Sequence, residues 1–182
     1  MKQYILKDTV TGKEIMECRK KLGLSQAEFA GFANVSKKTV ERWEYAKVPV
    51  TGPIVTLIHI LQEHPQIEEE LRLPERRTSL RLSYMFRDQL CSVIDVDERN
   101  REIQVVNYTR QLLKRAFGRV EKPDYEQYEE FLESRCFPRS RDKMKLMLRE
   151  LELPFYDPLM IIEKTQGRMA EDDFWLQIER QS

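Results

Sequence analysis

The feature that most constrains the fold is a twenty-residue unit that starts at Gln26. Five of its positions, the fourth, eighth, tenth, fifteenth and eighteenth, are apolar: Phe29, Ala33, Val35, Val40 and Trp43. The fifth position is Ala30, which lets two helices approach closely, and the ninth is Asn34, which tolerates the left-handed backbone of a tight turn. The unit therefore predicts two helices joined by a turn around a small core. The outward face of the second helix would be free to enter a DNA major groove.

Start and stop signals around this unit predict where its helices begin and end. Thr11 and Ser25 each open a Ser/Thr-x-x-Glu capping box, and Ser36 stands at the N-cap of the third predicted helix. Gly23 ends the first helix. Helical periodicity continues to residue 62, so an all-helical N-terminal domain is expected. Gly31 is unusual inside the second helix, where it lowers helix stability by ~1 kcal/mol relative to Ala.

These residues resemble the λ-repressor/Cro-like (XRE) helix-turn-helix family, especially its antitoxin and repressor members. The resemblance is carried by LSQAEFA at 24–30, by VSKKTVERWE at 35–44 and by VTGP at 50–53 with the leucines and isoleucine that follow, and it covers about residues 11–73. In that family the first residue of the second helix and the exposed first turn of the third contact DNA. The corresponding candidate DNA-binding residues are Gln26, Ser36, Lys37, Lys38, Thr39 and Arg42, with Ser36 as the cap and a backbone contact.

The chemistry of these side chains suits DNA independently of the family. A glutamine amide can pair with an adenine edge, while lysine and arginine suit guanine edges or phosphates. Residues 1–62 hold ten Lys or Arg against six Asp or Glu, whereas the rest of the neutral chain holds 21 against 25. A basic N-terminal half is where a nucleic-acid surface is expected. The alternative is that the lysines and arginine form only a solvated helix face.

A second domain is predicted after a short helix at 66–73 and a linker at 74–79. Alternating apolar residues from Leu80 to Val105 predict three short antiparallel strands. Helical patterns then follow at about 110–117, 124–135, 140–151, 157–165 and 170–175, with Phe174 and Trp175 closing the core. The expected fold class is an all-α helix-turn-helix domain (1–73) followed by a small α+β domain (80–182) with a short antiparallel sheet and then helices.

The stretch from Tyr125 to Ile178 is similar to an accessory segment found beside the kinase domain in HipA-like proteins of Firmicutes. The similarity is carried by FLESRCFPRSRD at 131–142, by the leucines at 148, 151 and 153, and by IEKTQGRMAEDDFW at 162–175. No phosphate-binding loop or kinase catalytic loop accompanies it, so the resemblance implies an accessory domain and no kinase activity.

A cluster of charged residues in this segment has two interpretations. Arg135, Arg139, Arg141 and Asp142 could bind a phosphate or an acidic partner. They could equally form an internal salt-bridge network that orients the helix after Pro138.

Several classes of site are not expected. Cys18, Cys91 and Cys136 are far apart, which predicts reduced structural thiols, and His59 and His64 lack metal-ligand partners at suitable spacing. Asp172 and Asp173 lie near a predicted helix start and need no metal to explain them. We expect no cofactor, no metal, no catalytic activity and no membrane association, and a cytoplasmic location.

The function that the sequence favours is a sequence-specific repressor of the antitoxin type. One helix-turn-helix module reads few base pairs, so a homodimer bound to an inverted-repeat operator is expected. The acidic C-terminal domain would dimerise or bind a partner protein, and the second resemblance implies a HipA-like kinase toxin as that partner. The alternative is a mobile-element regulator whose C-terminal domain senses a ligand or a protein.

Overall fold

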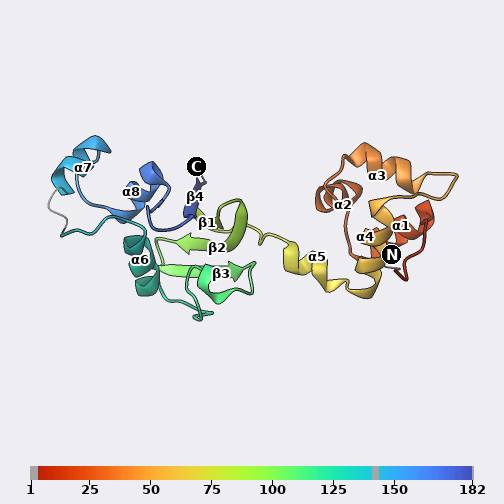
Figure 1. Ribbon diagram of the computed structural model, residues 1–182, viewed down its shortest axis with the longest axis horizontal. Coiled ribbons are helices and arrows are strands. Elements are labelled where there is room, and N and C mark those ends of the chain that lie inside the picture. The colour runs from red at the N-terminus through yellow and green to blue at the C-terminus, as the bar shows by residue number, and fades with distance from the viewer. Residues whose placement is uncertain (1–3, 141–143, 182) are drawn as a thin grey trace. The chain divides into compact units, whose positions relative to one another are not determined.

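The computed structural model describes residues 4–140 and 144–181, and the chain forms two compact units (Figure 1). Unit 1 comprises Met1–Leu73 and unit 2 comprises Pro74–Ser182. Unit 1 is helical, whereas unit 2 combines an antiparallel sheet with helices. The expected fold class, an all-α unit followed by an α+β unit, is confirmed.

The helices of unit 1 begin where the capping residues place them. They are α1 (Gly12–Lys21), α2 (Gln26–Phe32), α3 (Lys37–Glu44), α4 (Pro53–Glu63) and α5 (Gln66–Leu71). Thr11 and Ser25 form reciprocal capping boxes with Glu14 and Glu28, as predicted. The Ser36 side chain accepts a hydrogen bond from the Thr39 backbone N–H at 3.2 Å. These caps satisfy backbone donors that have no partner within the helix.

The apolar positions of the twenty-residue unit form the core of unit 1. Phe29 and Val40 are fully buried, and Trp43 is half-buried against the same cluster, which α1 and α4 complete. Asn34 has φ of 52°, so the left-handed turn between α2 and α3 is confirmed. Gly12 lies where α1 meets the end of α3, because a Cβ built there would be 2.5 Å from the carbonyl oxygens of Trp43 and Glu44.

Unit 2 is built on a four-stranded antiparallel sheet of order β3-β2-β1-β4. Its elements are β1 (Leu80–Phe86), β2 (Gln89–Asp97), β3 (Glu102–Asn107), the 3-10 helix η1 (Leu112–Lys114), α6 (Tyr125–Ser134), α7 (Met144–Glu150), α8 (Pro158–Thr165) and β4 (Phe174–Arg180). Alternate residues of β1 face the core, so Leu80 and Leu82 are fully buried. They pack with apolar residues of α6 and α8, including Phe131 and Ile161. Arg81 points to the opposite face and forms a buried pair with Asp95, its register partner on β2.

The predicted helix at 170–175 is wrong, because this segment leads into strand β4. β4 pairs with β1 along its full length, with Leu82 opposite Ile178 and Tyr84 opposite Leu176. Phe174, Leu176 and Ile178 therefore alternate toward the core, which is the period of a strand. Trp175 does not join that core, and its indole N–H donates to the Arg87 carbonyl oxygen at 2.6 Å.

Other boundaries in unit 2 also differ from the sequence expectations. The predicted sheet of three strands has four. The helix expected at 110–117 is a single 3-10 turn, since only Leu112–Lys114 is helical. The helix expected at 140–151 is described from Met144 to Glu150, residues 141–143 lie outside the described part, and Pro138 and Ser140 precede it without being helical.

Candidate nucleic-acid interface

Helix α3 buries one face and exposes the other. Val40 is 0% exposed and Glu44 is buried, whereas Lys38, Arg42 and Tyr45 are exposed. The exposed residues are four and three positions apart, so they form one stripe along the helix. Tyr45 is 74% exposed and directly follows the last residue of α3, and it is not among the DNA-binding residues predicted from the sequence.

A shallow concavity runs along this stripe. Its lining brings together four of the predicted DNA-binding residues with two further side chains: Ser36, Lys38, Thr39 and Arg42, with Glu41 and Tyr45. Lys37 is not part of it and lies 3.5 Å from Glu41. Within the part of the chain that the structure describes, Lys38 and Arg42 make no ion pair and no side-chain hydrogen bond. Their charges are therefore available to a ligand.

The start of α3 adds to the positive character of this surface. Ser36 and Thr39 hydroxyl oxygens are 2.9 Å apart, and the Ser36 hydroxyl also caps the helix. The first turn of a helix presents backbone N–H groups and the positive end of the helix dipole, which favour phosphate groups. No acidic residue lies in the first turn of α3.

Gln26 lies in the first turn of α2, does not line this concavity, and is held by a buried ion pair. Its Nε2 donates to Glu44 Oε2 at 2.8 Å. Glu44 in turn receives two hydrogen bonds from Arg19 of α1, at 2.6 and 3.1 Å. An amide nitrogen carries two protons, so one N–H and the carbonyl oxygen of Gln26 are still able to pair with an adenine edge.

The network of Arg19, Glu44 and Gln26 joins the three helices around the turn. Burial raises the pKa of Glu44, but the hydrogen bonds from Arg19 and Gln26 outweigh burial and hold that pKa below its ordinary value. Glu44 is therefore a carboxylate that fixes α1, α2 and α3 to one another. This pair is not evident from the sequence. Arg19 and Glu44 are 25 residues apart, and each fits an ordinary exposed helix position.

The arginine cluster of unit 2 is divided between different roles. Arg135 is buried and donates to the Asp172 carboxylate at 2.7 and 3.0 Å. It also donates to the carbonyl oxygens of Gly167 and Phe174. Arg139 instead pairs with Glu133 on the surface at 2.7 Å, and Arg141 and Asp142 lie outside the described residues.

The internal-network interpretation therefore holds for Arg135. The bonds made by this side chain tie the end of α6 to the segment that enters β4, so it does not orient the helix after Pro138. The hydrogen bond from Arg135 lowers the pKa of Asp172 despite the opposing effect of burial. Asp173, the neighbouring carboxylate, pairs with Arg87 at 2.8 Å.

Other classes of site have little support in residues 4–140 and 144–181. No group of three or more His, Cys, Asp or Glu there could hold a metal ion. Cys18, Cys91 and Cys136 are buried and unbridged, and burial raises the pKa of Cys136 to about 12, so these thiols are structural. No helix described is both long and apolar enough to cross a membrane.

Comparison with known proteins links the N-terminal part of the chain to antitoxins. Residues 1–72 match the family model described as the antitoxin component of the bacterial toxin-antitoxin system, MqsA. The chain is also 32% identical over 57 residues to the antitoxin HigA-2 of Vibrio cholerae serotype O1. That match covers 31% of this chain, and the chain spans about half the length of HigA-2 (55%). The chain is thus similar to antitoxins, while the XRE and HipA-associated resemblances remain predictions.

Proposed function

We propose that the chain is a sequence-specific DNA-binding regulator of the antitoxin type, without catalytic activity. Unit 1 binds a double-stranded operator with α3 in the major groove. The observation that carries this proposal is the exposed face of α3, where Lys38 and Arg42 have no protein partner among the described residues. The opposite face of the same helix is buried in the core, so the helix has one surface free for a groove.

The geometry of α3 suggests a division of roles among the predicted contacts. Lys38, Thr39 and Arg42 line the shallow concavity, which favours contacts with base edges. Gln26 contributes an amide that Glu44 holds in position. Lys37 lies off the stripe and pairs with Glu41, which favours a phosphate contact, and Ser36 offers its backbone beside the cap.

We further propose that the regulator binds as a homodimer to an inverted repeat. Two modules related by a dyad would contact half-sites one helical turn, ~34–36 Å, apart. Unit 2 would supply the dimer contacts or bind a protein toxin, because the comparisons are with antitoxins. A HipA-like kinase as that toxin rests only on the resemblance of residues 125–178.

Selection from random DNA followed by binding measurements tests this function. The full chain should enrich a palindrome, and a variant with Lys37, Lys38, Thr39 and Arg42 all changed to alanine should lose that affinity. Each specific contact contributes ~1–3 kcal/mol, so the combined loss should abolish measurable operator binding. Lys13→Ala, which removes an exposed lysine of α1, is the matched control and should bind as wild type does. A quadruple variant that is folded and binds the operator normally would contradict the proposed surface.

A further inference from the structure

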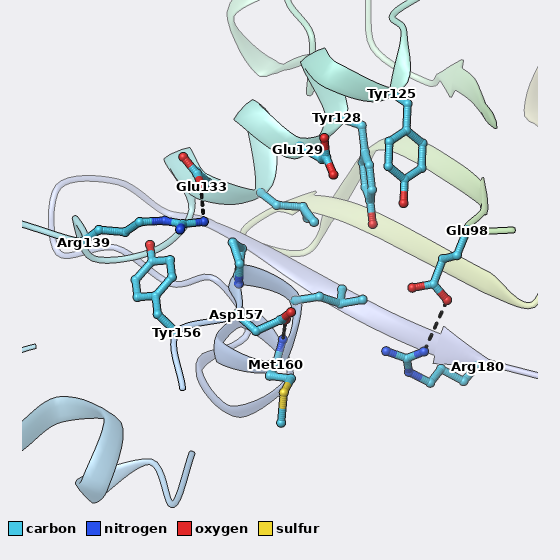
Figure 2. A pocket seen from close by; sticks show the side chains of 13 residues that line it. Glu98, Tyr125, Tyr128, Glu129, Glu133, Arg139, Tyr156, Asp157, Met160 and Arg180 are labelled. Atoms are coloured by element: carbon cyan, nitrogen blue, oxygen red, sulfur yellow. Dashed lines mark hydrogen bonds and ion pairs between the residues drawn. The ribbon is translucent and has the colours of Figure 1, made fainter. Parts of the chain in front are cut away.

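A pocket of about 570 Å³ lies in unit 2, and nothing in the proposed function uses it (Figure 2). Its wall is assembled from segments far apart in the sequence. They are the turn between β2 and β3, which contributes Glu98, helix α6, the segment after α6, which contributes Arg139, the segment around Tyr156 with the start of α8, and the end of β4, which contributes Arg180.

Negative charge predominates among the groups that line this pocket. The lining holds four carboxylates, Glu98, Glu129, Glu133 and Asp157, against the two arginines Arg139 and Arg180. Both arginines are already paired, and so is Glu129, whose carboxylate lies 3.0 Å from the Arg101 guanidinium. Arg139 lies 2.7 Å from Glu133, and Arg180 lies 2.8 Å from Glu163 and 3.6 Å from Glu98. The pocket is therefore poorly suited to an anion.

Tyr128 adds a polar group that the protein itself leaves unused. The residue is only 2% exposed, and its hydroxyl points into the pocket (Figure 2). This hydroxyl makes no hydrogen bond with any residue between 4 and 140 or between 144 and 181. Burial raises the pKa of Tyr128 well above its ordinary range, and the negative charge of Glu98 adds to that effect. A hydroxyl in such surroundings suits a hydrogen-bond donor that carries positive charge.

The tyrosines of the pocket already accept guanidinium groups on their rings. The Arg101 guanidinium lies 4.3 Å from the centre of the Tyr125 ring, and that of Arg139 lies 4.8 Å from the centre of the Tyr156 ring. A cation over an aromatic face is attracted by the ring, and more strongly when water is excluded. The rings and the carboxylates thus favour the same kind of ligand.

We propose that this pocket binds an organic cation, a guanidinium or alkylammonium group. Asp157, for which no ion pair occurs among the described residues, supplies charge, the Tyr128 hydroxyl accepts a hydrogen bond, and the tyrosine rings contact the cation. The group comes either from a basic side chain of a partner protein or from a free small molecule. This site goes beyond the proposed DNA-binding function and does not depend on it.

Nuclear magnetic resonance titration of the full chain tests the site without any substitution. N-acetyl-arginine-amide should shift the backbone resonances of Tyr128, Glu129 and Asp157. N-acetyl-citrulline-amide has nearly the same shape without the charge and should leave them unchanged. Equal shifts with both probes, or shifts of these residues with inorganic phosphate instead, would overturn the proposal.

Variants of the lining then identify which groups bind. Asp157→Asn removes a charge but keeps an N-cap for α8, where the Asp157 side chain now accepts from the Met160 N–H at 2.9 Å. This variant should weaken binding of the arginine probe roughly tenfold, and Tyr128→Phe should weaken it less. Asp88→Asn makes the same change of charge at the exposed β1–β2 turn and should have no effect. An equal loss for Asp88→Asn, or none for Asp157→Asn and Tyr128→Phe, would refute the assignment.

A comparison of two cations distinguishes the sources. The peptide N-acetyl-Gly-Arg-Gly-amide binding more tightly than agmatine supports a side chain of a partner protein. The reverse order supports a free small cation. Failure of both to bind overturns the site and leaves the DNA-binding proposal untouched, because operator binding is measured separately.

Discussion

Arg42 in unit 1 and Arg135 in unit 2 are both arginines at helix ends, but their surroundings differ. Arg42 is exposed, and no ion pair or side-chain hydrogen bond to it occurs in the described part of the chain. Arg135 is buried and makes charged hydrogen bonds to Asp172 together with bonds to two backbone carbonyls. An arginine whose N–H donors are all bonded inside the fold stabilises the structure, whereas an arginine whose donors face solvent can bind a ligand.

The two units also contain a scaffold pair of similar kind. In unit 1, Arg19 and Glu44 fix the helices around the candidate DNA surface, and Glu44 also holds Gln26. In unit 2, Arg135 and Asp172 hold the segment that enters β4. The contrast teaches that charge alone does not mark a binding surface, since the buried pairs and the exposed stripe use the same residue types.

The largest effect on stability is expected from Arg135→Ala. The substitution removes the Arg135 donors of two backbone carbonyls and leaves Asp172 with only its bond from the Phe174 N–H. Breaking a buried ion pair in this way typically costs ~3–5 kcal/mol. Arg139→Ala, which removes an arginine 63% exposed in its side chain, is the matched control and should cost at most ~1 kcal/mol. Chemical denaturation monitored on unit 2 measures both. Equal losses would break the distinction between the two arginines.

A comparable effect, dependent on pH, is expected from Glu44→Gln. The fold holds the pKa of Glu44 below its ordinary value of 4.5, so the carboxylate stabilises unit 1 above about pH 4.5 and less as the pH falls further. Glu44→Gln should destabilise unit 1 at neutral pH and flatten the loss of stability below pH 4.5. Glu63→Gln changes an exposed residue of α4 and should keep the wild-type profile. Melting curves between pH 3 and 7 measure this pH dependence. Parallel stability profiles for wild type and Glu44→Gln would show that the Glu44 carboxylate does not stabilise unit 1.

The fold of unit 1 could be predicted from the sequence because its signals are local. Capping residues, the spacing of apolar positions and the turn at Asn34 all act within a few residues of one another. The exposure of Lys38 and Arg42 followed from the same periodicity. The buried pair of Arg19 and Glu44 did not, because its energy depends on a contact between helices that sequence spacing does not reveal.

The errors in unit 2 have a similar cause. Strand β4 is defined by its pairing with β1, whose residues lie 88 to 100 positions earlier, from Phe86 opposite Phe174 to Leu80 opposite Arg180. Sequence periodicity in a short segment cannot show that pairing, and a short apolar run is ambiguous between helix and strand. The pocket of unit 2 was unpredictable for the same reason, because five separate segments supply its wall.

At the start of α3, substitutions of the predicted DNA-binding residues should change DNA binding and leave stability nearly unchanged. Thr39→Ala keeps the backbone N–H that Ser36 caps, so α3 should remain intact. It should relax base preference, with a loss of ~1–3 kcal/mol on the preferred operator. Lys37→Ala should instead weaken all sequences alike and reduce the slope of log affinity against log salt by ~1. Binding isotherms at several salt concentrations separate the two effects. A sequence-independent loss for Thr39→Ala would remove it from the base-contacting set.

The smallest expected effect is a gain in the stability of unit 1. It tests whether stability and DNA binding in this unit depend on different residues. Gly31 lies inside α2, has no positive φ, and a Cβ built there would meet nothing within 4 Å. Gly31→Ala should therefore raise the free energy of unfolding by up to ~1 kcal/mol, since alanine favours the helix and restricts the unfolded chain.

Gly12→Ala is the contrasting variant, because its methyl group would meet the Trp43 and Glu44 carbonyl oxygens and should destabilise the unit. Denaturation curves measure both changes, and operator affinity should be unchanged for Gly31→Ala. If Gly31→Ala stabilises unit 1 but weakens operator binding, residues of α2 other than Gln26 also belong to the DNA-binding surface.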